Sequence, residues 1–392
     1  MKKTVLYIFF MIFGFTAFSQ GDFGRVLSMV EKNNPVLKTL RSQIEAGKVE
    51  NRSENTLENP EVEVGYLWGT PSAIGNRTDF SISQTFDFPT LYLSRKKLIS
   101  LKDNSLELRY ASERLNVLME TQRNCAELVF YNALVELYGS KLRMVQDLHA
   151  AYRKKFESGE VSILDFNKAE FEYVSLKASY DESVLHRNAL LSDLAVLNGG
   201  DTVDFGLSVY EFVPIDENFE RWYSGIENKI PGLQLEENAL QLERQQLKVA
   251  KSNWLPQISI GYISEKEIEE RFQGLTVGIS LPLWSNARNV RSQKMRLQAV
   301  DNQYQSVRIQ YYGELKKVHA RAVGLQRNMD EMQKTILNCN TMELLQKAFE
   351  AGEISLLTYI QEQNFYMDIS VRFLEIQRDA MLAALELRAM EL

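Results

Sequence analysis

Hydrophobic and polar residues alternate with a period of two in four short stretches of this 392-residue chain. Such alternation predicts strands with one apolar and one polar face. Polar stretches at 69–78 and 265–274 separate the strands of each pair, which predicts two hairpins. The apolar positions that we expect to face lipid are Val62, Val64, Tyr66, Ile82, Ile258, Ile260, Val277 and Ile279.

Long proline-free stretches follow each predicted hairpin, from 90 to 213 and from 283 to the end. They are rich in Leu, Glu, Lys, Gln, Arg and Ala, which favour helices. Each is broken mainly at Gly159 or Gly352, so each predicts a long helix, a tight turn and a returning helix. The first helix, expected over about 91–156, would be roughly 100 Å long. Such a length indicates a coiled-coil or tube-like architecture.

The two halves of the chain repeat the same pattern. Residues 35 and 60 are prolines, as are 231 and 256, and each pair brackets a predicted helix. The segment 156–166 matches 349–359 at six of eleven positions. An ordered series of such matches predicts a tandem duplication. We therefore expect a signal peptide over 1–19, a first repeat over 20–200, a connector over 201–216 and a second repeat over 217–392.

The N-terminus has the layout of a secretory signal peptide. Lys2 and Lys3 precede an apolar run over 5–18, and the small residues Ala17 and Ser19 follow at the positions that a signal peptidase reads. The alternative is a membrane anchor, but this run is shorter than the roughly 20 residues of a spanning helix. No other apolar run in the sequence reaches that length. Membrane insertion would therefore require the strands.

Four strands per chain cannot close a barrel, and open strand edges are not tolerated in a bilayer. Two chains would supply eight strands, whose interior is largely filled by side chains. Three chains would supply twelve strands and leave a wider lumen. A pore in lipid therefore favours a trimer.

Composition limits the other possibilities. With 45% hydrophobic and 25% charged residues the chain is an ordinary folded protein, and its net charge of −7 argues against a nucleic-acid partner. Cys125 and Cys339 are too few for a disulfide framework, and we expect no bridge between them. The three histidines form no metal-binding or catalytic motif. We expect no cofactor, no metal site and no enzymatic activity.

The element order of helix, hairpin and long helical hairpin, present twice, resembles that of the TolC-like outer-membrane efflux (outer membrane factor) family. Local patterns that resemble this family are Asn34-Pro35-Val36-Leu37, the segments at 254–260 and 280–284, and the two glycine turns. The resemblance implies a mainly α fold with a small β part. It further implies a homotrimer with a 12-stranded β-barrel in the outer membrane of a Gram-negative-type bacterium, and a periplasmic tunnel of helices.

The same resemblance implies the exit duct of a tripartite efflux or export pump. The tunnel would dock, tips first, onto a periplasmic adaptor, and an inner-membrane transporter would supply the energy for passive passage of substrate. The glycine turn explains the glycine but not the other residues shared by the two copies. We therefore expect adaptor docking at Gly159, Glu160, Val161, Ser162, Gly352, Glu353, Ile354 and Ser355.

The family often carries an acidic residue six positions after each tip glycine. Here Asp165 occupies that position in the first copy and Thr358 in the second, so these two residues are the candidates for the periplasmic aperture. Two other classes of function stay open from the sequence. A periplasmic coiled-coil adaptor or scaffold without a barrel would be soluble without detergent, and an exported helical enzyme would require a polar site that the sequence does not show.

Overall fold

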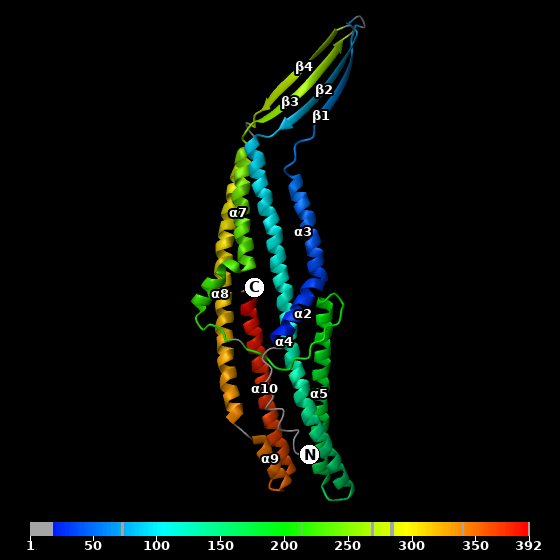
Figure 1. Cartoon of the computed structure of the whole chain (residues 1–392), viewed down its shortest axis with the longest axis vertical. Coiled ribbons are helices and arrows are strands. Elements are labelled where there is room, and N and C mark those ends of the chain that lie inside the picture. The colour runs from blue at the N-terminus through cyan, green and yellow to red at the C-terminus, as the bar shows by residue number, and fades with distance from the viewer. Residues whose placement is uncertain are drawn as a thin grey trace. The chain divides into compact units, whose positions relative to one another are not determined.

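The computed structural model describes residues 19–390 except 72–73, 213, 268–269, 283–285 and 339–340. Residues 1–18 of the expected signal peptide, Cys339 and part of the 280–284 segment lie outside this description. The chain divides into two compact units (Figure 1). The sheet unit comprises Thr39–Ser112 and Ile230–Tyr311, and the hairpin unit comprises Met1–Lys38, Glu113–Lys229 and Tyr312–Leu392.

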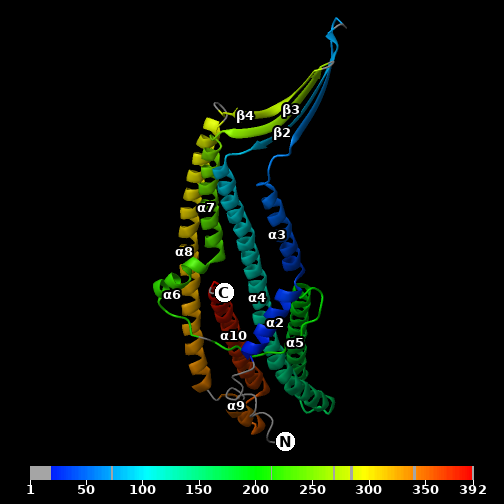
Figure 2. The same cartoon turned by 45° about the horizontal axis from the view of Figure 1, so that its top comes forward.

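In the sheet unit, one four-stranded sheet adjoins the ends of helices (Figures 1 and 2). The helices are α3 (Pro35–Ser53), α7 (Pro231–Ser252) and the first parts of α4 (Pro89–Glu157) and α8 (Asn286–Asn338). Both predicted short helices begin at the expected prolines, because a proline at the first helical position gives up no intrahelical hydrogen bond. The Asn34 side chain caps α3 by accepting from the backbone N–H groups of Val36 and Leu37 at 3.0 and 3.1 Å.

The sheet is antiparallel with the order β1-β2-β3-β4, so the two hairpins pair through β2 and β3. The strands are β1 (Glu61–Trp68), β2 (Asn76–Phe86), β3 (Gln257–Glu267) and β4 (Glu270–Ser280). The predicted loops at 69–78 and 265–274 were too long, because β2 begins at Asn76 and because β3 and β4 pair as far as Glu267 and Glu270. Polar residues there continue the strands, so three of the four strands have 11 residues and reach the 9–11 of a membrane-spanning strand.

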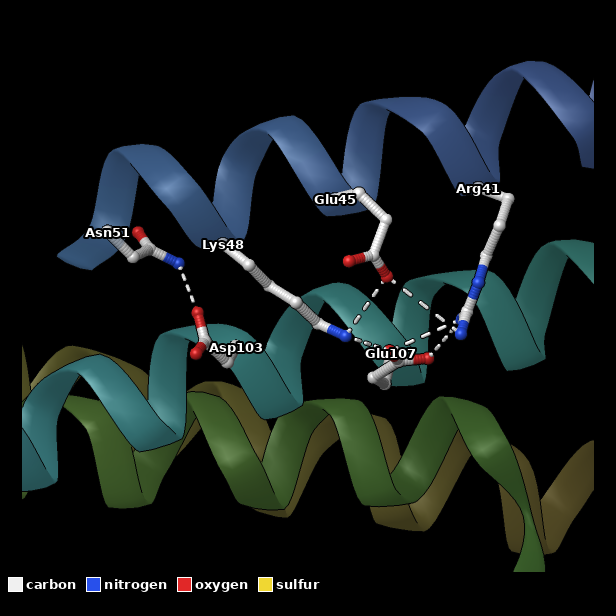
Figure 3. A network of polar contacts seen from close by, with 6 residues as sticks. All are labelled: Arg41, Glu45, Lys48, Asn51, Asp103 and Glu107. Atoms are coloured by element: carbon white, nitrogen blue, oxygen red, sulfur yellow. Dashed lines mark hydrogen bonds and ion pairs between the residues drawn. The ribbon is translucent and has the colours of Figure 1, made fainter.

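Charged side chains join α3 to α4 in the sheet unit (Figure 3). The Glu107 carboxylate accepts from Lys48 Nζ at 2.5 Å and from Arg41 at 2.9 Å. The hydrogen bond from Lys48, followed by the charge of Arg41, lowers the pKa of Glu107 below its usual range. One turn further on, Asn51 donates to Asp103 at 2.8 Å. The polar face of α3 therefore lies against α4, not against solvent alone.

The hairpin unit contains α5 (Ile163–Leu197), α9 (Thr341–Glu350), α10 (Leu356–Ala389) and the remainders of α4 and α8. The long α4 has 69 residues, about 100 Å at 1.5 Å per residue, which confirms the expected length. In the second repeat, the helix that corresponds to α4 consists of α8 and α9. Residues 339–340 between them lie outside the described residues. None of the described helices is long and apolar enough to cross a membrane.

Two helices of the hairpin unit were missed from the sequence. These are α2 (Ser19–Asn33), whose Val26 and Val30 are fully buried, and α6 (Phe219–Ile226). The predicted connector has no helix or strand in its described residues, but it is packed. Tyr210 is buried and its hydroxyl donates to the Ala126 carbonyl of α4 at 2.7 Å.

Candidate functional site

The two glycine turns of the hairpin unit follow the same backbone path. Gly159 and Gly352 have φ angles of +77° and +74°, and each N–H donates to the carbonyl three residues earlier at 3.0 Å. The next residue, Glu160 or Glu353, donates to the carbonyl five residues earlier at 2.8 or 2.9 Å. This pair of bonds is the Schellman motif, in which a left-handed residue ends a helix and glycine is strongly favoured.

A serine begins the returning helix at both turns. Ser162 Oγ accepts from the Asp165 N–H, and Ser355 Oγ accepts from the Thr358 N–H, each at 3.2 Å. Serine is a preferred N-cap because its oxygen satisfies one of the backbone donors that lack a partner in the first turn. The four named side chains therefore sit at equivalent positions of the two turns.

A stacked aromatic pair closes each turn. Phe156 and Phe166 have ring centroids 5.2 Å apart, and Phe349 and Tyr359 have centroids 4.2 Å apart. The expectation that the turn explains only the glycine was therefore wrong, because the turn also uses the aromatic residues and the serine. Glu160 accepts a hydrogen bond from Ser158 Oγ at 2.8 Å in the first turn. Among the predicted docking residues, the side chains of Glu160, Val161, Glu353 and Ile354 have no structural role that the two turns share.

Asp165 and Thr358 differ in their surroundings. The Asp165 carboxylate accepts from Ser162 Oγ at 2.7 Å and from Lys168 Nζ at 3.3 Å. These two hydrogen bonds, with the Ser162 bond the stronger cause, lower the pKa of Asp165. Thr358 shares a neutral hydrogen bond of 2.9 Å with Ser355. The structure thus gives Asp165 a capping role at its own turn; its place at an aperture stays a prediction.

A buried polar network further along the hairpin unit was missed from the sequence. Lys141 of α4 donates to Asn364 of α10 at 2.5 Å and forms an ion pair with Glu172 of α5 at 3.2 Å. Asn364 in turn donates to Glu172 at 3.0 Å. The Lys141 and Glu172 side chains are only 10% and 13% exposed. Sequence spacing gives no signal for this network, because charges at helical spacing ordinarily mark a solvated face.

In the sheet unit, the register separates two faces. Residues that pair directly across antiparallel strands point to the same side. All eight predicted lipid-facing positions share one face, through pairs such as Val62 with Ile82 and Ile260 with Val277. The opposite face carries small and polar residues, among them Ser81, Ser83, Ser259, Gly261, Thr276 and Gly278. The sheet is therefore amphipathic along its whole width.

The described residues contain no cluster of three or more His, Cys, Asp or Glu side chains that could hold a metal ion. Cys125 is fully buried in α4, and burial raises the pKa of its thiol to about 12, so it is unreactive near neutral pH. His319 is also buried; its Nε2 lies 2.7 Å from the Asp216 carbonyl. Both residues have a packing role.

No protein-family model and no curated protein sequence matches this chain. Solved structures do match it. It is similar to CusC, described as forming a transmembrane channel, with a TM-score of 0.76 and 13% identity over 94% of this chain and 92% of that one. It is similar to the outer membrane channel CmeC of Campylobacter jejuni, with a TM-score of 0.74 and 17% identity over 94% and 85% of the two chains.

The outer membrane protein VceC of Vibrio cholerae is also similar, with a TM-score of 0.73 and 13% identity over 94% of this chain and 96% of that one. The structural similarity establishes the fold. At identities this low it does not establish the activity, which has to be argued from the structure of this chain. Each of the three matches covers 94% of this chain. The chain has the fold of the TolC-like outer-membrane efflux channels.

Proposed function

We propose that this chain is one protomer of a trimeric outer-membrane exit duct through which substrate passes passively. The observation that carries the proposal is the amphipathic sheet within a fold that matches outer-membrane channels over 94% of the chain. Val277 and Ile279 are 72% and 67% exposed on its apolar face. A sheet with so large an exposed apolar face requires a cover, and lipid supplies it.

The sheet also requires partners at its edges. Within the described residues β1 pairs only with β2 and β4 only with β3, so both outer strands have an open side. Three copies joined edge to edge would give twelve strands and close these edges, with the polar face lining a lumen. The duct would then have no unpaired backbone groups in the lipid.

The hairpin unit supports an oligomer independently. Leu164, Phe171, Leu185 and Val196 of α5 are between 68% and 72% exposed. Their spacing places them within one stripe of a helix with 3.6 residues per turn. An apolar stripe of this length on an otherwise charged helix fits a contact with a second copy of the chain.

We further propose that the tips, which are the turns at Gly159 and Gly352, dock onto a periplasmic adaptor. An inner-membrane transporter would act through that adaptor. The two turns have one backbone conformation, so a trimer would present six similar tips. Val161 and Ile354 occupy the position just after the turn, where each is a half-buried β-branched apolar residue that follows an exposed glutamate. A partner with repeated hairpins would find equivalent sites around such a ring.

The assembly is tested by the mass of the detergent-purified protein and by two variants of β4. Val277→Lys places a cation on the proposed lipid face and should reduce insertion, since such a cation at the bilayer midplane costs about 2–4 kcal/mol. Thr276→Lys is the matched control on the polar face and should insert normally. Equal insertion of the two variants, or a mass that shows only monomer, would refute the duct and favour a soluble periplasmic scaffold.

Docking is tested separately, with the turns left intact. Val161→Asp combined with Ile354→Asp should abolish export and adaptor cross-linking while trimers form as before. Gln146→Asp, at an exposed polar position of α4 outside the apolar stripe of α5, is the control and should export normally. Full export by the double variant would refute docking at these positions without touching the proposed barrel.

A further inference from the structure

Exposed cations gather where the helices of the sheet unit meet the sheet. They come from α4, α7 and α8, within about 16 residues of a strand end. The set, named here the basic zone, is Lys96, Lys97, Arg244, Lys248, Lys251, Arg288, Arg291, Lys294 and Arg296. The basic zone lies in the sheet unit, whereas the turns at Gly159 and Gly352 belong to the hairpin unit.

Hydrogen bonds hold the three helices of the basic zone together. Asn286 at the start of α8 donates to the Asn253 carbonyl just after α7. Gln245 of α7 donates to the Ser94 carbonyl of α4 at 2.9 Å. Figure 1 shows these helix ends side by side at the base of the sheet. The cations of α4, α7 and α8 therefore belong to one surface.

These cations are not part of the protein's own charge network. Among the described residues none of the nine forms an ion pair, whereas Arg41, Lys48 and Lys102 of the same unit all pair with glutamates. The first 15 residues of α8 contain no acidic residue, and neither do residues 89–102 of α4. Of the acidic residues of α7, Glu237 is exposed and Glu236 and Glu243 are half-buried, while the exposed Glu50 and Glu58 lie on α3 and the segment after it.

Helix stability does not explain the arrangement either. The N-terminus of a helix carries a partial positive charge, which favours Asp and Glu in the first turn and disfavours cations. The first turns of α4 and α8 have no acidic residue, and Arg288 lies in the first turn of α8. An external anion bound near the N-termini of α4 and α8 would offset the repulsion between these cations and the partial positive charge of the helix ends.

Exposed apolar side chains accompany the cations. Leu93 of α4 and Met295 of α8 are 69% and 65% exposed, and Trp254, between α7 and β3, is 44% exposed. Tryptophan is enriched at the level of lipid headgroups, where one part of its ring system is wet and the other is apolar. Cations mixed with such residues next to a membrane-spanning segment fit a headgroup layer better than bulk water.

We infer that the basic zone binds anionic phospholipid headgroups of the leaflet from which the helices emerge, an inference that rests on the proposed insertion of the sheet. The phosphates supply the counter-charge that residues 89–102 of α4 and the first 15 residues of α8 lack, and Trp254, Leu93 and Met295 contact the acyl boundary. The zone thereby sets the depth at which the duct sits in its membrane. The recognised chemistry is a lipid phosphate monoanion presented by a surface, not a soluble phosphate.

The test uses the full-length protein in nanodiscs of phosphatidylcholine alone or with one quarter phosphatidylglycerol, and measures the lipids that copurify after detergent extraction. The wild-type protein should enrich phosphatidylglycerol over its bulk fraction. The combined variant Arg291→Gln, Lys294→Gln, Arg296→Gln should lose this enrichment, by about fivefold per cation at low salt. The matched control on the same helix, Lys317→Gln, Arg321→Gln, Lys334→Gln, makes the same charge change and should retain it.

The outcomes are distinct. Equal enrichment by the two triple variants would overturn the inference while the proposed duct stands, because incorporation into phosphatidylcholine alone tests the sheet separately. Displacement of the lipid by millimolar inorganic phosphate would also overturn it, since that would indicate a small-anion site. Failure of the wild-type protein to enter either kind of disc would overturn both the inference and the proposed duct.

Discussion

The two helical hairpins of the hairpin unit share a turn and differ in what surrounds it. Both turns use a left-handed glycine, a serine cap and a stacked aromatic pair. Only the first adds a carboxylate with a lysine partner, because the residues 193 positions after Asp165 and Lys168 are Thr358 and Gln361. The backbone requirement of a tight reversal is therefore common to both copies, and the charges are not.

The same contrast continues along the helices. Lys141 of the first hairpin is buried and paired, whereas Lys334, which follows it by the same 193 positions, is exposed. The partner of Lys141 on the second hairpin is Asn364. The first hairpin thus carries the charged half of a network whose neutral half comes from the second.

Removing Lys141 should have the largest effect. In Lys141→Met the Glu172 carboxylate stays buried without its cation, which should destabilise the hairpin unit by about 3 kcal/mol. Thermal unfolding in detergent measures the loss. Lys334→Met is the matched control at the exposed equivalent and should change stability by less than about 0.5 kcal/mol.

Adding Glu172→Leu to Lys141→Met should restore much of the loss, because no unpaired buried charge then remains. If Lys141→Met and Lys334→Met unfold at the same temperature, the buried network does not distinguish the two hairpins.

The glycine variants should have the next largest effect, and an equal one in both copies. Gly159→Ala and Gly352→Ala force an alanine into the left-handed region, which costs roughly 1–2 kcal/mol. An added Cβ would meet no atom within 4 Å at either position, so no steric clash adds to this figure. Gly324→Ala, inside α8, should instead stabilise by about 0.5–1 kcal/mol. A much larger loss at one turn than at the other would show that the two turns are not equivalent.

Elements with a local signal were predictable from the sequence. Pro35 and Pro231 mark the starts of α3 and α7, Gly159 and Gly352 mark the two turns, and period-two alternation marks the strands. The shared face of the eight apolar strand positions followed from the same alternation. These features depend on residues close together in the chain, which is why a single sequence was sufficient.

The missed features depend on neighbours that are distant in the sequence. The extension of β3 to Glu267 comes from its pairing with β4 and β2, and not from the apolar pattern, which ends earlier. The Lys141 network joins residues 223 positions apart, and each member alone resembles a surface residue. The stacking of Phe156 on Phe166 likewise gave the repeated phenylalanine a structural role that spacing alone did not show.

Variants of the two N-cap serines should have a smaller effect on stability than the glycine variants, and they compare the same two turns. Ser162→Ala and Ser355→Ala should each destabilise by about 1 kcal/mol through loss of the N-cap. The loss should be somewhat larger for Ser162, because its hydroxyl donates to the Asp165 carboxylate, whereas the Ser355 hydroxyl shares only a neutral hydrogen bond with Thr358. Ser192→Ala, in the interior of α5, should be neutral or slightly stabilising, since alanine is the better helix former. Equal effects at positions 162 and 192 would show that the cap contributes nothing at this turn.

The smallest expected effect is a pH dependence confined to the first turn. Because its pKa is lowered in the folded protein, Asp165 contributes stability that is complete above the pKa of about 3.9 of an unfolded aspartate. That contribution is lost as the pH falls through the lower folded pKa. Asp165→Thr makes the first turn resemble the second and should flatten the acid end of the stability curve, measured by unfolding between about pH 5 and pH 2. Thr358→Asp should introduce only a weaker pH dependence at the second turn, because Gln361 stands there at the position that corresponds to Lys168. An unchanged acid limb in Asp165→Thr would contradict the role of the Ser162 and Lys168 hydrogen bonds in holding this carboxylate ionised.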